Sequence, residues 1–325
     1  MIRYLARRLA FAVVLVATVS SASLVLARLA PGDYVTGMLG GRVSSEVMAR
    51  ERARLGLDRS VAAMYRDWAV AALRLDFGRS MLYDRPVADL IPERAANTAI
   101  LAAAALVFAT LVGLPLGIVT GTRRGGALAS LVRAASLVLL SMPPLLTSLA
   151  LVFVAARTGW LPIAGMRSST GATGGAALDL LRHLIVPALA IGLPLAATLE
   201  RLQAQAMSET IGRPFVLAAA ARGLPRRRVV WRGALKAALG PVAAMYGLMI
   251  GTLLSGSFAV EVITAWPGLG SLMLQALRAR DVYLVAGCAG AGALFLALGT
   301  MASDLALALV DPRASERGPD VEAAA

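Results

Sequence analysis

Long uncharged apolar runs alternate with polar segments along the chain. The runs cover residues 9–27, 95–122, 134–156, 184–199, 237–260 and 282–303. Five of them reach about the 18 to 20 residues that cross a bilayer as a helix, and the fourth does so once His183 or Glu200 at its ends is included. The pattern predicts an all-α integral membrane protein with six transmembrane helices.

The polar segments divide the chain into a membrane part and an insertion. Residues 30–94 mix arginines and acids. We expect them to form a small helical, partly strand-containing domain, with turn and packing signals at Tyr65, Trp68, Phe77, Gly78 and Pro86. The expected layout is a first segment and helix at 1–29, the insertion at 30–94, a membrane domain at 95–310 with helices at about 95–122, 134–156, 183–203, 238–260 and 282–309 and a loop at 209–237, and a tail at 311–325.

Basic residues predict the orientation of these helices. With the N-terminus inside, the short inner segments hold Arg3, Arg7, Arg8, Arg123, Arg124, Arg133 and the block from Arg201 to Lys236. Short outer segments hold fewer, which is the positive-inside bias. Both termini are therefore expected in the cytoplasm and the insertion outside. A cleaved signal peptide is the alternative for the first run, but its apolar core is long and no clean small-x-small cleavage site precedes the polar region.

Composition excludes a soluble domain, because 58% of the residues are hydrophobic and 16% are charged. The formal charge of +13 could suggest a nucleic-acid footprint. Here, however, the basic block is tethered between two membrane spans. We expect no nucleic acid, and we expect membrane lipid with anionic headgroups to balance part of the charge.

The most basic loop reads VLAAAARGLPRRRVVWRGALKAALGPV at 216–242. Good helix formers at 216–221 predict a short helix, and Gly223 permits a left-handed turn. Pro225 suits the first turn of a second helix, which continues to Leu239 before Pro241 opens the fifth span. A short helix, a turn and a second helix make a shape that another protein could grip.

This loop resembles the cytoplasmic "EAA" loop of permease subunits in bacterial ABC importers. Ala221-Arg222-Gly223-Leu224 match the A-x-G-L motif of the peptide-importer branch, and Pro241 keeps that branch's spacing from Gly223. The resemblance covers nearly the whole chain, through MIRYLARRL, PGDYVTGMLG, LGLDRSVAAMYRDW, LDFGRSMLYDRPV, GWLPIAGM, VEVITAWPGLGSLMLQALRARD and DLALALVDPR. These segments are similar, in order, to the B-type permeases of the dipeptide/oligopeptide/nickel family.

The resemblance implies a type I ABC importer transmembrane domain and a set of partners. These are a second homologous permease subunit, two ATP-binding subunits and an extracytoplasmic substrate-binding protein. The short helix of the loop would be the coupling helix, which contacts the ATPase through Leu217, Ala218, Ala219, Ala220, Ala221, Arg222, Gly223 and Leu224, while Arg226, Arg227 and Arg228 orient the loop. Departures from the family pattern at Leu217, Gly233 and Ala237 suggest a matched ATPase with its own groove.

Motifs for catalysis are absent from the sequence. The single lysine, Lys236, lies in ALKAA, so no P-loop occurs, and neither H-E-x-x-H nor a cysteine pair is present. We expect a chain that is not an enzyme and binds no metal or cofactor, with ATP and Mg held by the partner subunits. His183 is expected to be an interfacial residue at the outer end of the fourth span, and Cys288 a small packing residue.

Two features of the spans allow two interpretations each. Ser141, Pro143 and Pro144 could form a broken helix that lines the transport pathway, or a kink of plain packing. Glycines and a serine repeat every four residues and let helices approach closely, in either a static or a moving interface. These residues are Gly113, Gly117 and Gly121, and Gly247, Gly251 and Ser255.

The expected function is import of short di- or oligopeptides. Nickel or a nickel chelate is the alternative, weakened because one cysteine and one histidine lie far apart in sequence. A secondary transporter would place ionisable groups in mid-membrane, whereas Glu200, Glu261 and Asp304 are expected near span ends. A membrane scaffold would not explain the ordered importer motifs.

Overall fold

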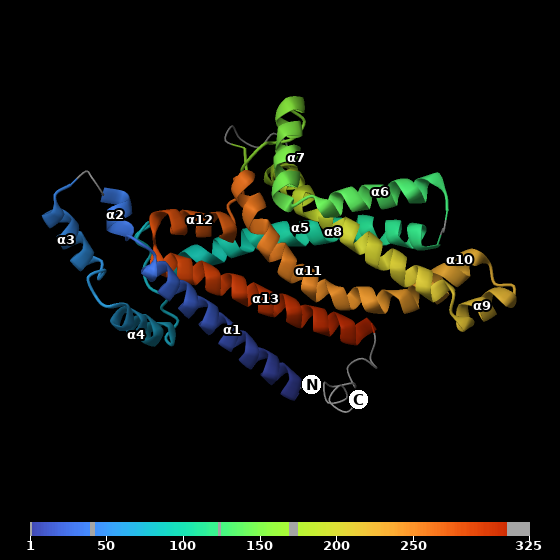
Figure 1. Cartoon of the computed structure of the whole chain (residues 1–325), viewed down its shortest axis with the longest axis horizontal. Helices are drawn as coiled ribbons and strands as arrows, with labels where there is room; N and C mark the ends of the chain where they lie inside the picture. The colour runs from blue at the N-terminus through green and yellow to red at the C-terminus, as the bar shows by residue number, and fades with distance from the viewer. Residues whose placement is uncertain (1, 40–42, 123–124, 169–174, 311–325) are drawn as a thin grey trace. The chain divides into compact units, whose positions relative to one another are not determined.

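The computed structural model describes residues 2–39, 43–122, 125–168 and 175–310 (Figure 1). The predicted tail at 311–325 and the inner arginines Arg123 and Arg124 lie outside these residues. The regular elements of the described ranges are helices. The chain divides into two compact units, residues 1–100 with 265–298 and residues 101–264 with 299–325. The prediction of an all-α protein is confirmed.

In the part of the chain that the structure describes, five helices are long and apolar enough to cross a bilayer. They belong to α1 (Ile2–Leu29), α5 (Val87–Thr122), α8 (Ala176–Ile211), α11 (Leu235–Ile263) and α13 (Val282–Val310). The shorter helices α6 (Ala127–Ser141) and α7 (Pro144–Thr158) pass the same test as a pair. Counting this pair as one span gives the six that the sequence predicts.

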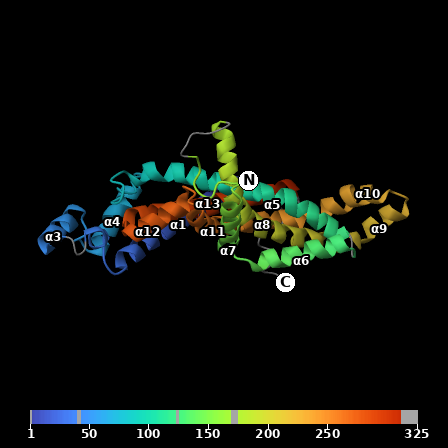
Figure 2. The same cartoon turned by 90° about the horizontal axis from the view of Figure 1, so that it is seen from above.

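The third predicted span, 134–156, is not one helix. α6 ends at Ser141, and α7 starts at Pro144 at an angle of 107° to it. Figures 1 and 2 both show the two helices diverging at this break. The reason is local: each proline disfavours the helical region for the residue before it. Met142 and Pro143 are accordingly extended, with ψ of 117° and 146°.

The first unit is built on α1, α4 (Val61–Ala72), α12 (Leu269–Ala279), the start of α5 and most of α13. Leu24 of α1, Trp68 of α4 and Ala286 of α13 belong to one buried apolar cluster. The Trp68 indole N–H donates to the carbonyl of Phe77 at 3.2 Å. The aromatic residues of the insertion therefore fasten it to the transmembrane helices of its own unit.

The expectation of strands in the insertion is wrong for the residues that the structure describes. The insertion holds α2 (Tyr34–Leu39), α3 (Ser45–Arg54) and α4, and its β pairing is an isolated bridge between Arg79 and Pro86. Positive φ angles at Gly78 and Asp84 turn the chain too tightly for a longer ladder. Residues 87–94, which were assigned to the insertion, form the first turns of α5.

Trp266 secures the loop before α12 within the first unit. Its side chain is fully buried, and its indole N–H donates to the carbonyl of Asn97 at 3.0 Å. The Asn97 amide in turn donates to the carbonyl of Pro267 at 2.8 Å, and the Thr98 hydroxyl accepts from the Leu269 N–H at 2.8 Å. These bonds satisfy polar groups that burial would otherwise leave unpaired.

The second unit is organised around α8, which packs against α6, α7 and α11. The glycine ladder of α5 also faces it. A Cβ on Gly113 would lie 2.5 Å from the Ala196 carbonyl oxygen, one on Gly117 2.6 Å from the Glu200 carbonyl oxygen, and one on Gly121 2.5 Å from the Ala204 carbonyl oxygen. Only glycine permits such backbone contact. In the second ladder Gly247 is buried, and the side chain of Ser255 lies outside the described residues.

Candidate functional site

A short helix, α9 (Pro214–Ala221), follows α8 after a break at Gly212 and Arg213. Pro214 occupies the first helical position, where its missing N–H costs nothing. The helix ends at Arg222, whose N–H donates to the Ala218 carbonyl at 3.2 Å, and Gly223 follows with φ of +80°. The sequence therefore forms a short helix stopped by a left-handed glycine.

Most of α9 faces outward. Val216 is buried and Ala219 is half-buried, whereas Phe215 and Leu217 are 48% and 57% exposed. The other residues expected to contact the ATPase are exposed as well: Ala218, Ala220, Ala221, Arg222, Gly223 and Leu224. An apolar helix that turns most of its side chains outward from a basic loop is suited to contact another protein.

The return arm of the loop runs without a break into the fifth span. It comprises α10 (Arg226–Arg228), the π-helix η1 (Val229–Ala234) and α11 (Figure 1). Pro241 lies inside α11, so the expectation that it opens the span is wrong. A proline is tolerated there because other groups can satisfy the carbonyl that loses its donor in a transmembrane helix.

The three arginines expected to orient the loop are exposed. A guanidinium nitrogen of Arg226 donates to the carbonyl of Thr122, the last residue of α5, at 3.3 Å. That carbonyl lies at the negative end of the helix dipole, which favours a cation. Arg226 therefore ties the loop to a transmembrane helix, while Arg227 and Arg228 extend from α10 into solvent.

Sequence reasoning missed two exposed aromatic residues in this loop. Phe215 is on α9 and Trp231, 51% exposed, is on η1. Two aromatic residues within the most basic segment of the sequence could have indicated a contact surface there. Aromatic side chains are common anchors of protein interfaces, so both belong with the candidate coupling residues.

Ser141, Pro143 and Pro144 stand at the bend between α6 and α7. Ser141 and Pro143 are exposed and Pro144 is partly covered. The Ser141 hydroxyl donates back to the carbonyl of Leu137, four residues earlier in α6, at 2.9 Å. Their role in lining a pathway stays a prediction.

Two polar residues of α8 are buried. Glu200, at the end of the fourth apolar run, is 1% exposed, and α8 continues past it to Ile211. Its Oε1 accepts a hydrogen bond from the Thr120 hydroxyl of α5. His183 is buried among protein atoms, with Nδ1 2.8 Å from the Asp179 carbonyl oxygen. Its place at the outer membrane interface stays a prediction.

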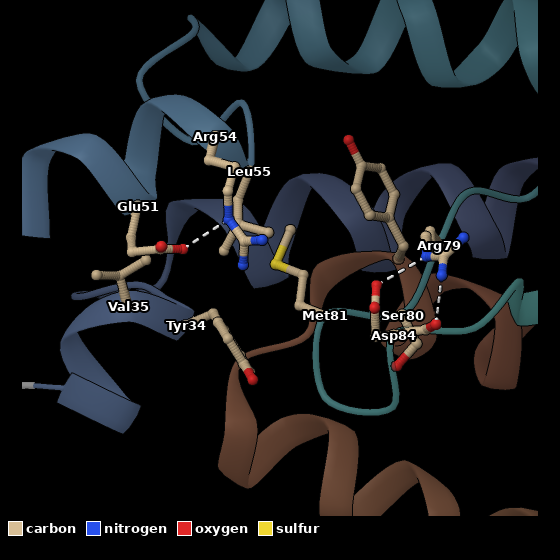
Figure 3. Close-up of a pocket in the computed structure, with 10 residues that line it drawn as sticks. Tyr34, Val35, Glu51, Arg54, Leu55, Arg79, Ser80, Met81 and Asp84 are labelled. Atoms are coloured by element: carbon tan, nitrogen blue, oxygen red, sulfur yellow. Dashed lines mark hydrogen bonds and ion pairs between the residues drawn. The ribbon is translucent and has the colours of Figure 1, made fainter.

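The first unit contains a cavity of about 380 Å³ lined by residues of the insertion and by Tyr283 (Figure 3). Arg54 pairs with Glu51, and Arg79 pairs with Asp84, each at 2.8 Å. The hydrogen bond from Arg79 lowers the pKa of Asp84, and burial raises the pKa of the Tyr34 phenol. Two charged pairs and two phenols line the cavity together with the apolar side chains of Val35, Leu55 and Met81, a mixture typical of surfaces that contact another protein.

Comparison with known proteins decides the family. A family profile described as "Binding-protein-dependent transport system inner membrane component" matches residues 113–316, and the profile for the N-terminal part of such components matches residues 1–102. The chain belongs to this family. It is thus a multi-span component of a bacterial inner-membrane transport system, with the transmembrane domain of a type I ABC importer.

Relatives of this binding-protein-dependent component align over nearly their full length. The di/tripeptide transport system permease protein DppB of Pseudomonas aeruginosa (strain UCBPP-PA14) is 32% identical over 96% of this chain and 98% of its own. The dipeptide transport system permease protein DppB of Escherichia coli (strain K12) is 30% identical over the same shares. The oligopeptide transport system permease protein AppB of Bacillus subtilis (strain 168) is 28% identical over 96% and 99%.

Proposed function

We propose that this chain is the permease subunit of an ATP-driven importer that carries short peptides across the cytoplasmic membrane. The names of the relatives, which specify dipeptides, di/tripeptides and oligopeptides, support the substrate class. The observation that supports the mechanism is α9, an exposed apolar helix in the most basic loop of the chain. Gly223, in a left-handed conformation, follows the end of this helix.

The proposed assembly contains this chain, a second homologous permease subunit, two ATP-binding subunits and a substrate-binding protein outside. This chain binds no cofactor and is not an enzyme; ATP and Mg belong to the ATP-binding subunits. Both termini and the loop at 209–237 face the cytoplasm, and the insertion faces outward. The cavity beside Tyr34 and Arg79 is the surface we assign to the substrate-binding protein.

In the proposed mechanism, α9 sits in a groove of the ATPase, with Leu217 to Leu224 as the contact. Closure of the ATPase on ATP moves α9, and the motion enters the membrane by two routes. One is the two-residue connection into α8, and the other is the continuous run from Arg226 through η1 into α11. Arg226 holds the loop against the end of α5, so that the motion is not lost in the loop itself.

Peptide is favoured over nickel as the substrate. A peptide can be selected by the binding protein and released into a pathway with loose complementarity, whereas a bare metal ion needs thiol, imidazole or carboxylate ligands. Among the described residues, no group of three or more His, Cys, Asp or Glu side chains gathers that could hold a metal ion. A nickel chelate would travel without such ligands and is the second candidate.

Reconstitution tests the substrate. The permease pair, both ATPases and the binding protein are placed in liposomes with ATP inside, and uptake of labelled dipeptide, longer peptide and nickel is compared. We expect ATP-dependent peptide uptake that excess unlabelled peptide abolishes and that is lost without the ATPases. Nickel uptake that peptide fails to inhibit would overturn the peptide assignment but not the importer.

Cysteine labelling tests the orientation. Asp58 and Arg227 are exposed and lie in the insertion and in the loop; the single native cysteine, Cys288, is buried and is replaced by alanine first. In intact cells a membrane-impermeant maleimide should label Asp58→Cys and not Arg227→Cys, which should react only after lysis. The reverse pattern would invert the proposed topology.

The coupling role is tested at Gly223. A β-branched residue is strongly disfavoured at φ of +80°, so Gly223→Val should uncouple or release the ATPase. Gly212→Ala is the control, because Gly212 has φ of −79° and an added Cβ would meet only ordinary contact at 3.8 Å. Normal assembly and transport with Gly223→Val would refute the assignment of α9.

A further inference from the structure

A hydrogen bond between α5 and α8 lies beside the glycine ladder. The Thr120 hydroxyl lies within hydrogen-bond distance of Glu200 Oε1 on α8 and of the Leu116 carbonyl on its own helix, which share its one proton, and the side chains of Thr120 and Glu200 are at least 95% buried. Gln203, one turn further along α8, is completely buried, and its Cβ would lie 2.6 Å from a Cβ on Gly117. The polar cluster is therefore built into the closest contact of the two helices.

The ladder alone does not fix how α5 is placed along α8. Gly113, Gly117 and Gly121 repeat every four residues, so a slip of one repeat would put Gly113 where Gly117 is and Gly117 where Gly121 is. The close backbone contact would largely survive, because two of the three places would again hold a glycine and the third would hold Ala109. Packing of small residues permits at least two registers, about one helical turn apart.

The polar pair distinguishes these registers. After that slip Leu116 would take the place of Thr120, and a buried carboxylate would face an apolar side chain without a donor. In the opposite slip the place of Thr120 falls to residue 124, beyond the end of α5 at Thr122. Buried polar pairs are known to specify register in this way where apolar packing is degenerate.

We propose that Thr120 and Glu200 are positioning residues that fix the register of α5 on α8, so that motion of α9 moves both helices together. This step rests on the proposed function, because α8 leads into α9. Glu200 Oε2 and both amide atoms of Gln203 are buried and form no hydrogen bond within the described part of the chain. Because these atoms are unpaired, the bond with the Thr120 hydroxyl is the hydrogen bond that the described residues provide for Glu200 at this contact.

The first test measures the pair without any transport. Thr120→Val, Glu200→Leu and the double variant are compared by thermal unfolding of the purified permease complex. Thr120→Val should lower the unfolding midpoint of the otherwise wild-type complex, and it should lower it less when Glu200 is already leucine, because the interaction is then already absent. Fully additive losses would show that the two side chains act separately and would overturn the proposal.

Gln203→Met, which removes unpaired amide atoms, should raise the midpoint; a lower midpoint would show that Gln203 supports the contact.

The second test measures peptide imported per ATP hydrolysed in the complete reconstituted transporter. Thr120→Val should lower this ratio by about threefold, the shift in an equilibrium that an average interhelical hydrogen bond in a membrane produces. Thr120→Ser and Glu200→Gln keep the donor and the acceptor and should restore the ratio. If Thr120→Val leaves this ratio unchanged while the wild type imports peptide, the positioning role of Thr120 and Glu200 is refuted and the proposed function is unaffected. Absence of uptake by the wild type would instead contradict the proposed function and leave the unfolding test standing.

Discussion

The hydroxyl of Ser80 donates a 2.6 Å hydrogen bond to Oδ2 of Asp281, although the two residues are 201 positions apart. The same carboxylate accepts the backbone N–H groups of Leu82 at 3.0 Å and Leu284 at 3.1 Å. Asp281 is fully buried and directly precedes α13. One side chain thus caps a transmembrane helix, where a negative charge is favourable, and holds the loop at the end of the insertion.

Asp281→Ala should destabilise the permease by about 1.5 to 3 kcal/mol, because hydrogen bonds to a charged group are lost and buried donors remain unpaired. Thermal or denaturant unfolding of the purified protein measures the change. Asp58→Ala is the matched control at an exposed position and should stay within about 0.5 kcal/mol of the wild type. Equal effects of the two substitutions would show that the Asp281 cap contributes nothing.

Gly117→Leu should force α5 and α8 apart, since its Cβ would lie 2.6 Å from the Glu200 carbonyl oxygen. Overpacking of this kind costs about 1 to 3 kcal/mol or more. The yield of monodisperse protein and its unfolding midpoint report the loss. Gly240→Ala in α11 is the control, because no atom lies within 4 Å of the added Cβ, and alanine favours the helix by about 1 kcal/mol.

Phe215→Ser should weaken binding of the ATPase by about tenfold, because it removes an exposed apolar anchor worth about 1.4 kcal/mol. Titration of the purified permease complex with ATPase gives the dissociation constant. Leu73→Ser is the control: Leu73 is 87% exposed but lies in the insertion, so the same polar change should leave ATPase binding unaltered. Equal affinity of both variants and the wild type would exclude Phe215 from the contact.

Asp33 gives the insertion a pH-dependent element. Burial raises the pKa of this carboxyl, but hydrogen bonds from Thr36 and Arg52 outweigh burial and hold it below the ordinary value of 3.8. Its stabilising contribution is therefore present above that value and is lost as the pH falls through the lower folded pKa. The difference in unfolding midpoint between wild type and Asp33→Asn should be constant near neutral pH and should shrink toward zero below pH 3.8. A gap that widens on acidification would contradict the sign.

The sequence predicted the parts of the fold that depend on local chemistry. Apolar runs predicted the spans, and Gly223 predicted the end of α9 because a left-handed turn suits glycine. The start of α9 at Pro214, two residues before the predicted 216, was not predicted. The sharpness of the bend at Met142 could not be predicted, since two prolines break a helix without fixing the angle between its parts. Burial of Glu200 also escaped, because it depends on Thr120, 80 residues away. The outward face of α9 needed the three-dimensional contacts of Val216.

The length of α8 has a consequence for the lipid that surrounds the protein. Its 36 residues extend about 54 Å, whereas the hydrocarbon layer of a bilayer is about 30 Å thick. A bilayer that grows or thins by a few ångströms therefore covers a different stretch of α8 without altering the helix that links the membrane to α9. Transport should accordingly change little across liposomes whose acyl chains differ by two to four carbons. The reason is that the motion of α9 is transmitted along α8, which is longer than any of these membranes is thick.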